Sequence, residues 1–145
     1  MLFKIKLFMS LPKKKFREAV FQLLYSYDIT KAITNDAIDF VADQLKITKK
    51  ATFNAKDYTM KIVENIEQLD NLIQKECLEY RTERISKIEL NILRLSAYEM
   101  YFDKIPPKVV LAEAIRLSKK FSTPSGANFV NGILNAIYQK INVKD

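Results

Sequence analysis

Hydrophobic residues recur along this chain at intervals of three and four, the spacing that places them on one face of an α-helix. The spacing predicts a first helix over residues 13–29, a second that begins near the cap candidate Thr34, and a long third over residues 54–78. The apolar positions of these helices are Phe16, Val20, Leu23, Leu24 and Tyr27, then Ala37, Ile38, Val41 and Leu45, then Tyr58, Ile62, Ile66, Leu69 and Ile73.

The second half of the chain predicts three more helices. One begins with a capping-box spacing, Ser86 to Glu89, and is apolar nearly all round, so we expect it to lie between other helices. The next opens at Pro106 and Pro107 and runs to about Phe121, and a last helix follows the break STPSGA. No segment alternates as a strand would. The pattern therefore predicts an all-α fold of about six to seven helices.

Composition agrees with this fold class and limits the chemistry. Only two glycines and four prolines leave little material for hairpin turns, and the absence of histidine removes the commonest acid–base residue and metal ligand. The one cysteine, Cys77, cannot form an internal disulfide, and its helical spacing with Ile73 and Tyr80 favours packing over a reactive thiol. We therefore expect no catalytic residue, no metal site and no cofactor, and a cytoplasmic location.

The net charge of +7 is unevenly distributed along the chain. Residues 1–33 carry seven basic and two acidic groups, residues 34–80 six and nine, and residues 81–145 eleven and six. Both ends are therefore cationic and the middle is not. A field of this kind suits an acidic partner, with nucleic acid as the first candidate.

The first residues, MLFKIKLFMS, form an apolar stretch that Lys4 and Lys6 interrupt. The stretch is too short to span a membrane, and no small-residue cleavage pattern follows it. We expect residues 1–11 to be an N-terminal extension that need not be ordered, with Met1 and Met9 both open as the start of translation. Residues 12–145 are expected to form a single domain.

The first predicted helix begins with a basic collar, which we define as Lys13, Lys14, Lys15 and Arg17. On a helical wheel Tyr25 falls almost opposite the apolar face, and Lys14, Glu18 and Phe21 lie within about 40° of it, while Arg17 lies on the flank. Cations track phosphates and aromatic rings stack on unpaired bases, so this combination favours single-stranded RNA. The alternative is that another helix covers Phe21 and Tyr25 and that the lysines are a solvated helix start.

Three segments resemble the NusB family of bacterial transcription antitermination factors. They are KKKFREAVFQLLYSYD, IELNILRLSAYEM, and IPPKVVLAEAIRLSKKFS followed by NFVNGILNAI. The motifs occur in the family's order over most of residues 12–138, while residues 30–80 match weakly. The resemblance implies a fold of two packed helical bundles and a non-enzymatic protein. It also implies binding of the boxA element in ribosomal RNA leader transcripts together with NusE, a small-subunit ribosomal protein.

The same resemblance implies wider partners. The complex of RNA, NusE and the protein would join RNA polymerase and other Nus factors and would not involve a membrane. In the absence of NusE, a monomer and a homodimer are both open.

Site residues follow from the resemblance position by position. The basic collar (Lys13, Lys14, Lys15 and Arg17) matches the family's RNA-binding run, and Phe129 matches a residue at the RNA surface. Tyr25 and Glu89 match positions implicated in NusE contact. Asn131 shares the polar face of the last helix with Asn128 and Asn135, and these amides could bind RNA or face solvent.

Each assignment has a competing structural interpretation. Glu89 is the last residue of the capping box, so it could cap its helix, contact a partner, or do both. Phe129 could belong to the core, and Gly132 is best explained by close approach of two helices. As a whole, the chain could be a protein-interaction module without RNA sequence preference. NusB-like domains also occur in RNA methyltransferases, but the glycine-rich cofactor loop and the catalytic domain of such enzymes have no counterpart in these residues.

Overall fold

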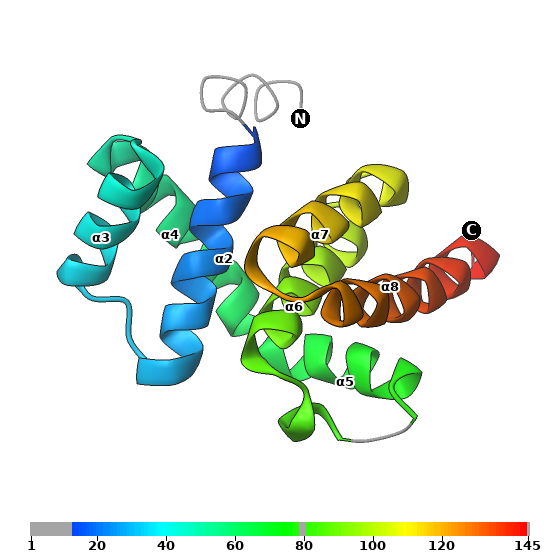
Figure 1. The fold of residues 1–145 in the computed structure, drawn as a ribbon. Helices are drawn as coiled ribbons and strands as arrows, with labels where there is room; N and C mark the ends of the chain where they lie inside the picture. Colours follow the sequence, from blue (N-terminus) through cyan, green and yellow to red (C-terminus); the bar gives the residue numbers. More distant parts are fainter. Residues whose placement is uncertain (1–12, 79–80, 145) are drawn as a thin grey trace. The chain divides into compact units, whose positions relative to one another are not determined.

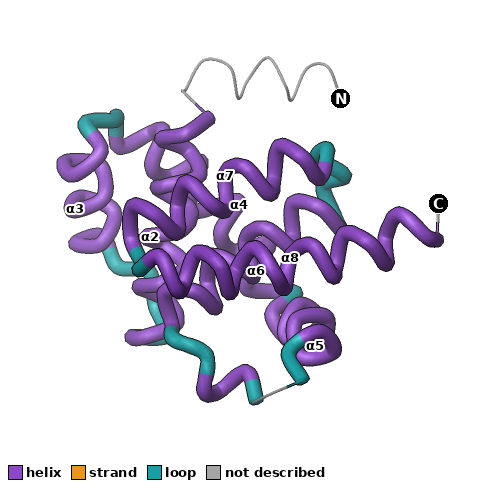
Figure 2. Tube along the Cα trace, turned by 45° about the vertical axis from the view of Figure 1, so that its right-hand side comes forward, coloured by secondary structure: helices purple, strands orange, loops and turns teal. Residues whose placement is uncertain are grey.

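The computed structural model describes residues 13–78 and 81–144, and these residues are helical almost throughout (Figure 1, Figure 2). The described part of the chain contains seven α-helices, one short 3-10 helix and no strand, which confirms the all-α prediction. In order they are α2 (Lys13–Thr30), α3 (Asn35–Leu45), α4 (Lys49–Glu64), α5 (Ile66–Glu76), the 3-10 helix η1 (Thr82–Arg84), α6 (Lys87–Tyr101), α7 (Pro107–Phe121) and α8 (Pro124–Lys144).

The helices divide into two compact units, one up to Val63 and one from Glu64 onward. The first unit holds α2, α3 and nearly all of α4. The second unit holds α5 to α8. The extension predicted for residues 1–11 lies outside the described residues, and the single domain over residues 12–145 stays a prediction.

Threonine caps set the helix boundaries of the first unit. The predicted cap at Thr34 is confirmed, because its hydroxyl accepts a hydrogen bond of 3.1 Å from the backbone N–H of Ala37. Thr48 caps α4 in the same way, accepting from the N–H of Ala51 at 3.0 Å. The core of this unit includes a ring contact between Phe16 of α2 and Tyr58 of α4, whose centroids lie 5.5 Å apart.

The long third helix predicted over residues 54–78 is wrong in its boundaries. Helix α4 begins earlier, at Lys49. The helix is interrupted at Asn65, whose φ of −113° and ψ of 15° separate α4 from α5. The apolar spacing continues across this break, because Ile62, Leu69 and Ile73 are all fully buried. The spacing of apolar residues indicates which side chains are buried. It could not reveal that the helix is interrupted, because the spacing is the same on both sides of Asn65.

The prediction that the helix after Ser86 lies centrally is confirmed. Every residue of α6 from Leu90 to Met100 is buried, and α5, α7 and α8 all pack against this helix. At its end Tyr98 stacks on Phe102 with ring centroids 5.2 Å apart. Burial raises the pKa of the Tyr98 hydroxyl, with smaller effects in the same direction from the carboxylates of Asp103 and Glu64.

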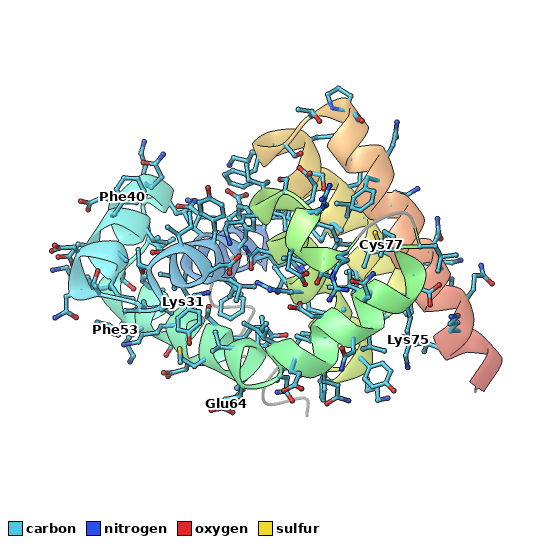
Figure 3. All side chains as sticks on the ribbon, turned by 90° about the horizontal axis from the view of Figure 1, so that it is seen from below. Lys31, Phe40, Phe53, Glu64, Lys75 and Cys77 are labelled. Atoms are coloured by element: carbon cyan, nitrogen blue, oxygen red, sulfur yellow. The ribbon has the colours of Figure 1, made fainter. Side chains whose placement is uncertain are left out.

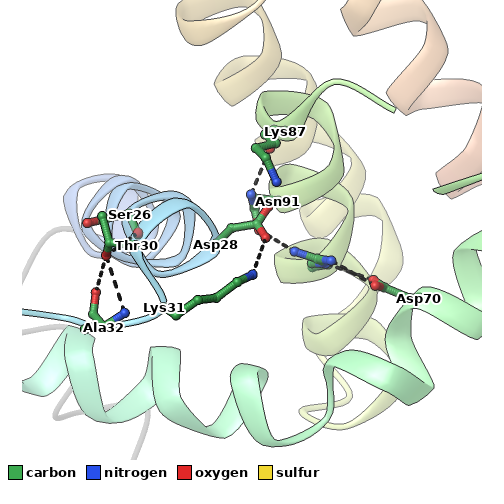
Figure 4. A network of polar contacts seen from close by, with 9 residues as sticks. Ser26, Asp28, Thr30, Lys31, Ala32, Asp70, Lys87 and Asn91 are labelled. Atoms are coloured by element: carbon green, nitrogen blue, oxygen red, sulfur yellow. Dashed lines mark hydrogen bonds and ion pairs between the residues drawn. The ribbon is translucent and has the colours of Figure 1, made fainter. Parts of the chain in front are cut away.

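Two charged side chains of α6, Arg94 and Glu99, are buried, and Arg94 is paired with Asp70 of α5 (Figure 4). The guanidinium of Arg94 donates from Nε to Oδ1 and from Nη2 to Oδ2 of Asp70, both at 2.8 Å. Its Nη1 donates to Asn91 Oδ1 at 3.1 Å, and Asn91 Nδ2 in turn donates to the carbonyl of Lys87 at 2.8 Å. Arg94 therefore ties α5 to α6 through a bidentate ion pair that the amide of Asn91 supports.

Candidate nucleic-acid interface

The basic collar lies in the first turns of α2. Lys14 is exposed and Lys15 is half-buried, while the side chain of Lys13 lies outside what the structure describes. The first turn of α2 holds no acidic residue. The partial positive charge of a helix N-terminus makes this an unfavourable place for lysines unless an anion is bound there. The exposed part of the collar is therefore a suitable contact for phosphate.

The outward face predicted for this helix is only partly correct. Phe21, Glu18 and Arg17 are buried, with exposed fractions of 4%, 5% and 6%. Tyr25 is half-buried, and its ring centroid lies 6.3 Å from that of Phe21. The wheel assigned solvent to the side opposite the apolar stripe, whereas α2 is buried on more than one side. Phe21 is therefore unavailable for stacking on a base, and Tyr25 keeps part of its surface.

Glu89 is bound within the second unit and does not form the predicted capping box. Ser86 is the N-cap of α6, yet among the described residues its side chain makes no capping hydrogen bond. The carboxylate of Glu89 instead accepts a hydrogen bond from the hydroxyl of Ser122, in the turn between α7 and α8. The Ser122–Glu89 bond therefore connects the start of α6 to the turn that leads into α8.

Gly126 leaves the space that this bond occupies. It lies in the first turn of α8, which Thr123 caps by accepting a hydrogen bond of 2.9 Å from the Gly126 N–H. A Cβ atom at Gly126 would lie 2.8 Å from Glu89 Oε2 and would overlap the hydroxyl oxygen of Ser122. The STPSGA segment, interpreted from the sequence as a break, is therefore the start of a helix and the binding site of the Glu89 carboxylate. Ser122 and Gly126 were not predicted as site residues, although the sequence held one signal for them, a glycine three residues after the capping Thr123.

Replacing Gly126 with alanine is expected to lower the free energy of unfolding by about 1 kcal/mol, because the new methyl group displaces the Ser122 hydroxyl and the Glu89 carboxylate and breaks their hydrogen bond, while the gain in helix propensity offsets part of this cost. Urea denaturation would measure the loss. Gly132→Ala is the matched control, since a Cβ atom there meets nothing within 4 Å. That change should stabilise the protein by up to ~1 kcal/mol through helix propensity alone. Equal behaviour of the two variants would contradict the packing around Glu89.

Helix α8 carries the remaining predicted RNA residues. Phe129 and Asn131 are half-buried, whereas Asn128, Gly132 and Asn135 are exposed. The explanation of Gly132 by close helix–helix approach is wrong, because the space beside it is open. Phe129, Asn131 and Glu89 all belong to the second unit, while the basic collar and Tyr25 belong to the first.

Metal-binding groups and membrane-spanning helices were sought among the described residues. Within residues 13–78 and 81–144, no group of three or more His, Cys, Asp or Glu side chains could hold a metal ion. Over the same ranges, no helix has the length and apolar character needed to cross a membrane. Cys77 is buried, in agreement with a packing role.

Comparison with known proteins points to one family. The model of the NusB family matches residues 14–139. The transcription antitermination protein NusB of Chloroherpeton thalassium (strain ATCC 35110 / GB-78) is 34% identical over 142 residues, which cover 94% of this chain and only 65% of that protein. The protein of the same name from Clostridium perfringens (strain SM101 / Type A) is 37% identical over 130 residues, or 88% of this chain and 96% of that protein.

A solved structure has the same fold. The crystal structure of the antitermination factors NusB and NusE in complex with double-stranded RNA contains a chain that is 31% identical. The match covers 88% of this chain and 96% of that chain, with a TM-score of 0.75. The family model extends from Lys14 of the basic collar over the central helix α6 and most of α8. The chain therefore belongs to the NusB family.

Proposed function

We propose that this protein is a transcription antitermination factor that binds the boxA element of ribosomal RNA leader transcripts together with NusE. Binding would support processive transcription of ribosomal RNA operons. The observation that carries the proposal is the start of α2, where the cations of the basic collar stand at a helix N-terminus with Lys14 exposed and Lys15 half-buried. Membership in the NusB family, and likeness to a NusB solved with NusE and RNA, support it.

The roles of the individual residues are those that the resemblance to the family implies. Lys13, Lys14 and Lys15 would hold phosphates, and buried Arg17 would contribute less than its position in the sequence implies. Phe129 and Asn131 on α8 would contact RNA through the ring and the amide. Tyr25 and Glu89 would contact NusE.

The wider setting is part of the same proposal. The protein would act without catalysis, in the cytoplasm, as one component of an RNA polymerase complex that contains other Nus factors. The described residues supply two surfaces for such binding, the cationic start of α2 and the asparagine-bearing face of α8.

The test is fluorescence anisotropy with three labelled RNAs of equal length: a boxA-like single strand, a scrambled single strand and a duplex of the boxA-like sequence. Each is titrated with the protein at two salt concentrations, with and without the cognate NusE. The proposal expects the boxA-like strand to bind most tightly and its binding to strengthen when NusE is present. Equal binding of the two single strands in the presence of NusE would overturn it.

A protein-interaction module without RNA sequence preference is the second candidate. The burial of Phe21 favours it, since only Tyr25 of the two aromatics expected to face outward keeps part of its surface exposed. Under this alternative NusE would bind with the same affinity whether or not RNA is present. Isothermal titration of NusE into the protein, with and without the boxA-like RNA, would distinguish the two functions.

A further inference from the structure

A second group of lysines and an aromatic ring lies where α3 ends and α4 begins. We call it the α4 cluster and define it as Lys46, Lys49, Lys50, Phe53 and Lys56. Lys46, Lys49 and Lys50 are exposed, and 43% of the Phe53 surface is exposed. The ammonium of Lys56 lies 5.9 Å from the centroid of the Phe53 ring, within the range of a cation–π contact.

The stability of the fold does not explain this cluster. Helix α4 buries its opposite face, which holds Thr52, Ala55, Tyr58, Thr59 and Ile62. Its first turn contains no acidic residue and opens with two lysines, against the helix dipole. An exposed phenylalanine likewise forgoes the favourable burial of its ring.

One ion pair is present in the cluster, and it is weak. Lys49 Nζ lies 3.2 Å from Asp39 Oδ1, with side chains that are 70% and 51% exposed. Exposed pairs of this kind contribute little and exchange readily with other ions. A phosphate could therefore replace Asp39 as the partner of Lys49 at small cost.

The α4 cluster lies at the same end of the first unit as the basic collar. Both the start of α2 and the turn from α3 into α4 are at this end in two views (Figure 1, Figure 2). Phe16, one residue after the collar's lysines, packs against Tyr58. Tyr58 is nine residues, or ~14 Å of helix, from the first residue of α4. Phe53 lies on α4 between its first residue, Lys49, and Tyr58, so it belongs to the part of α4 that extends beyond the contact with Phe16 (Figure 3).

We propose that the α4 cluster is a second contact for single-stranded RNA, binding nucleotides that flank the segment held by the basic collar. The chemistry is the same at both places, since lysines neutralise phosphates and an exposed ring offers a face for an unpaired base. A duplex would leave Phe53 unused, because its bases are already stacked. This inference rests on the proposed function and adds a site in the part of the chain that matched the family motifs least well.

RNA length is the variable that tests the proposal. Two single strands are compared in the presence of NusE: a boxA-like core, and the same core with about six unstructured nucleotides added at each end. The variants are Lys49→Ala/Lys50→Ala and Phe53→Leu, the second of which keeps an apolar side chain and removes the ring. The control is Lys75→Ala/Lys108→Ala, which removes two exposed lysines of the second unit. Circular dichroism confirms that each variant is folded.

The wild-type protein should bind the extended strand more tightly than the core. The double lysine variant should reduce the salt slope of log K against log[salt] for the extended strand by ~1.4, and Phe53→Leu should weaken that strand by about fivefold. Both variants should leave binding of the core unchanged. Equal losses on both strands, or no loss on either, would overturn the second site.

The two proposals fail in different ways. If the protein does not prefer the boxA-like core over the scrambled core, the proposed function is refuted. The second site is still decided by whether the α4 variants weaken binding of the extended strand. A length dependence that the α4 variants do not alter refutes the second site alone. If the α4 variants instead lose binding to a polyglutamate peptide while RNA binding is unchanged, the cluster is a contact for an acidic protein and the proposal is wrong.

Discussion

Replacing Arg94 with alanine is expected to lower the free energy of unfolding by about 3 kcal/mol or more, the largest effect of any single change considered. The guanidinium is 7% exposed and makes two hydrogen bonds of 2.8 Å to the carboxylate of Asp70, which is 24% exposed. Its removal leaves the half-buried carboxylate of Asp70 without its counterion, and because that carboxylate keeps contact with water the loss should fall at the lower end of the ~3–5 kcal/mol found for buried pairs. Urea denaturation followed by circular dichroism would measure the change.

A double-mutant cycle of Arg94→Met, Asp70→Leu and the double variant separates the interaction of the two residues from the cost of leaving one charge unpaired. Arg94→Met/Asp70→Leu removes both charges and should recover much of the stability lost in Arg94→Ala. Arg81→Ala is the control, because Arg81 pairs with Glu83 at 3.0 Å while both side chains stay largely exposed, at 80% and 69%. That change should leave the free energy of unfolding nearly unchanged. Comparable losses in Arg94→Ala and Arg81→Ala would show that burial of the α5–α6 pair adds nothing to stability.

Replacing Lys14 and Lys15 together with alanine is expected to weaken RNA binding by roughly 25-fold at 0.1 M salt and to reduce the salt slope by ~1.4. Each lysine that contacts a phosphate of a single strand contributes about 0.7 to the slope, so two contacts account for both numbers. Anisotropy titrations with the boxA-like RNA at several salt concentrations would measure the slope and the affinity together. Stability should change little, because Lys14 is exposed and Lys15 half-buried.

Arginine at the same positions provides the complementary test. The guanidinium can hold a phosphate through two hydrogen bonds where an ammonium acts as a point charge, so Lys14→Arg/Lys15→Arg should bind at least as tightly as the wild-type protein. Lys75→Ala/Lys108→Ala removes the same charge from the second unit and serves as the control. An unchanged salt slope in the alanine variant would show that the basic collar does not contact phosphate.

Local sequence was sufficient to predict most of the helices of this protein. Thr34 capped α3 as expected, Pro106 and Pro107 opened α7, and the helix that is apolar on all sides proved to be buried along its whole middle. These features depend on residues within one or two turns of each other, so the sequence contains their physical causes directly. The motifs that identified the family lie within the same segments, those that form α2, α6, α7 and α8.

Other features were decided by residues far apart in the sequence. The sequence left the burial of Phe21 open between two interpretations and gave no sign that Glu18 and Arg17 are buried, because a helical wheel identifies one apolar face and cannot show that a helix is covered on a second. The break at Asn65 was hidden for a related reason, since burial continues through it.

Tertiary structure also decided the partners of the charged residues. Glu89 had an apparent local role in a capping box, but a hydroxyl 33 residues later binds its carboxylate, in the space that Gly126 leaves open. Arg94 meets Asp70 across 24 residues, and the lysines of α4 lie at the same end of their unit as those of α2. Local sequence was enough to predict that the chain is helical, where most of its helices lie and which side chains carry charge. Which charges meet was settled only by packing, because a hydrogen bond or an ion pair depends on distance in space rather than on separation along the chain.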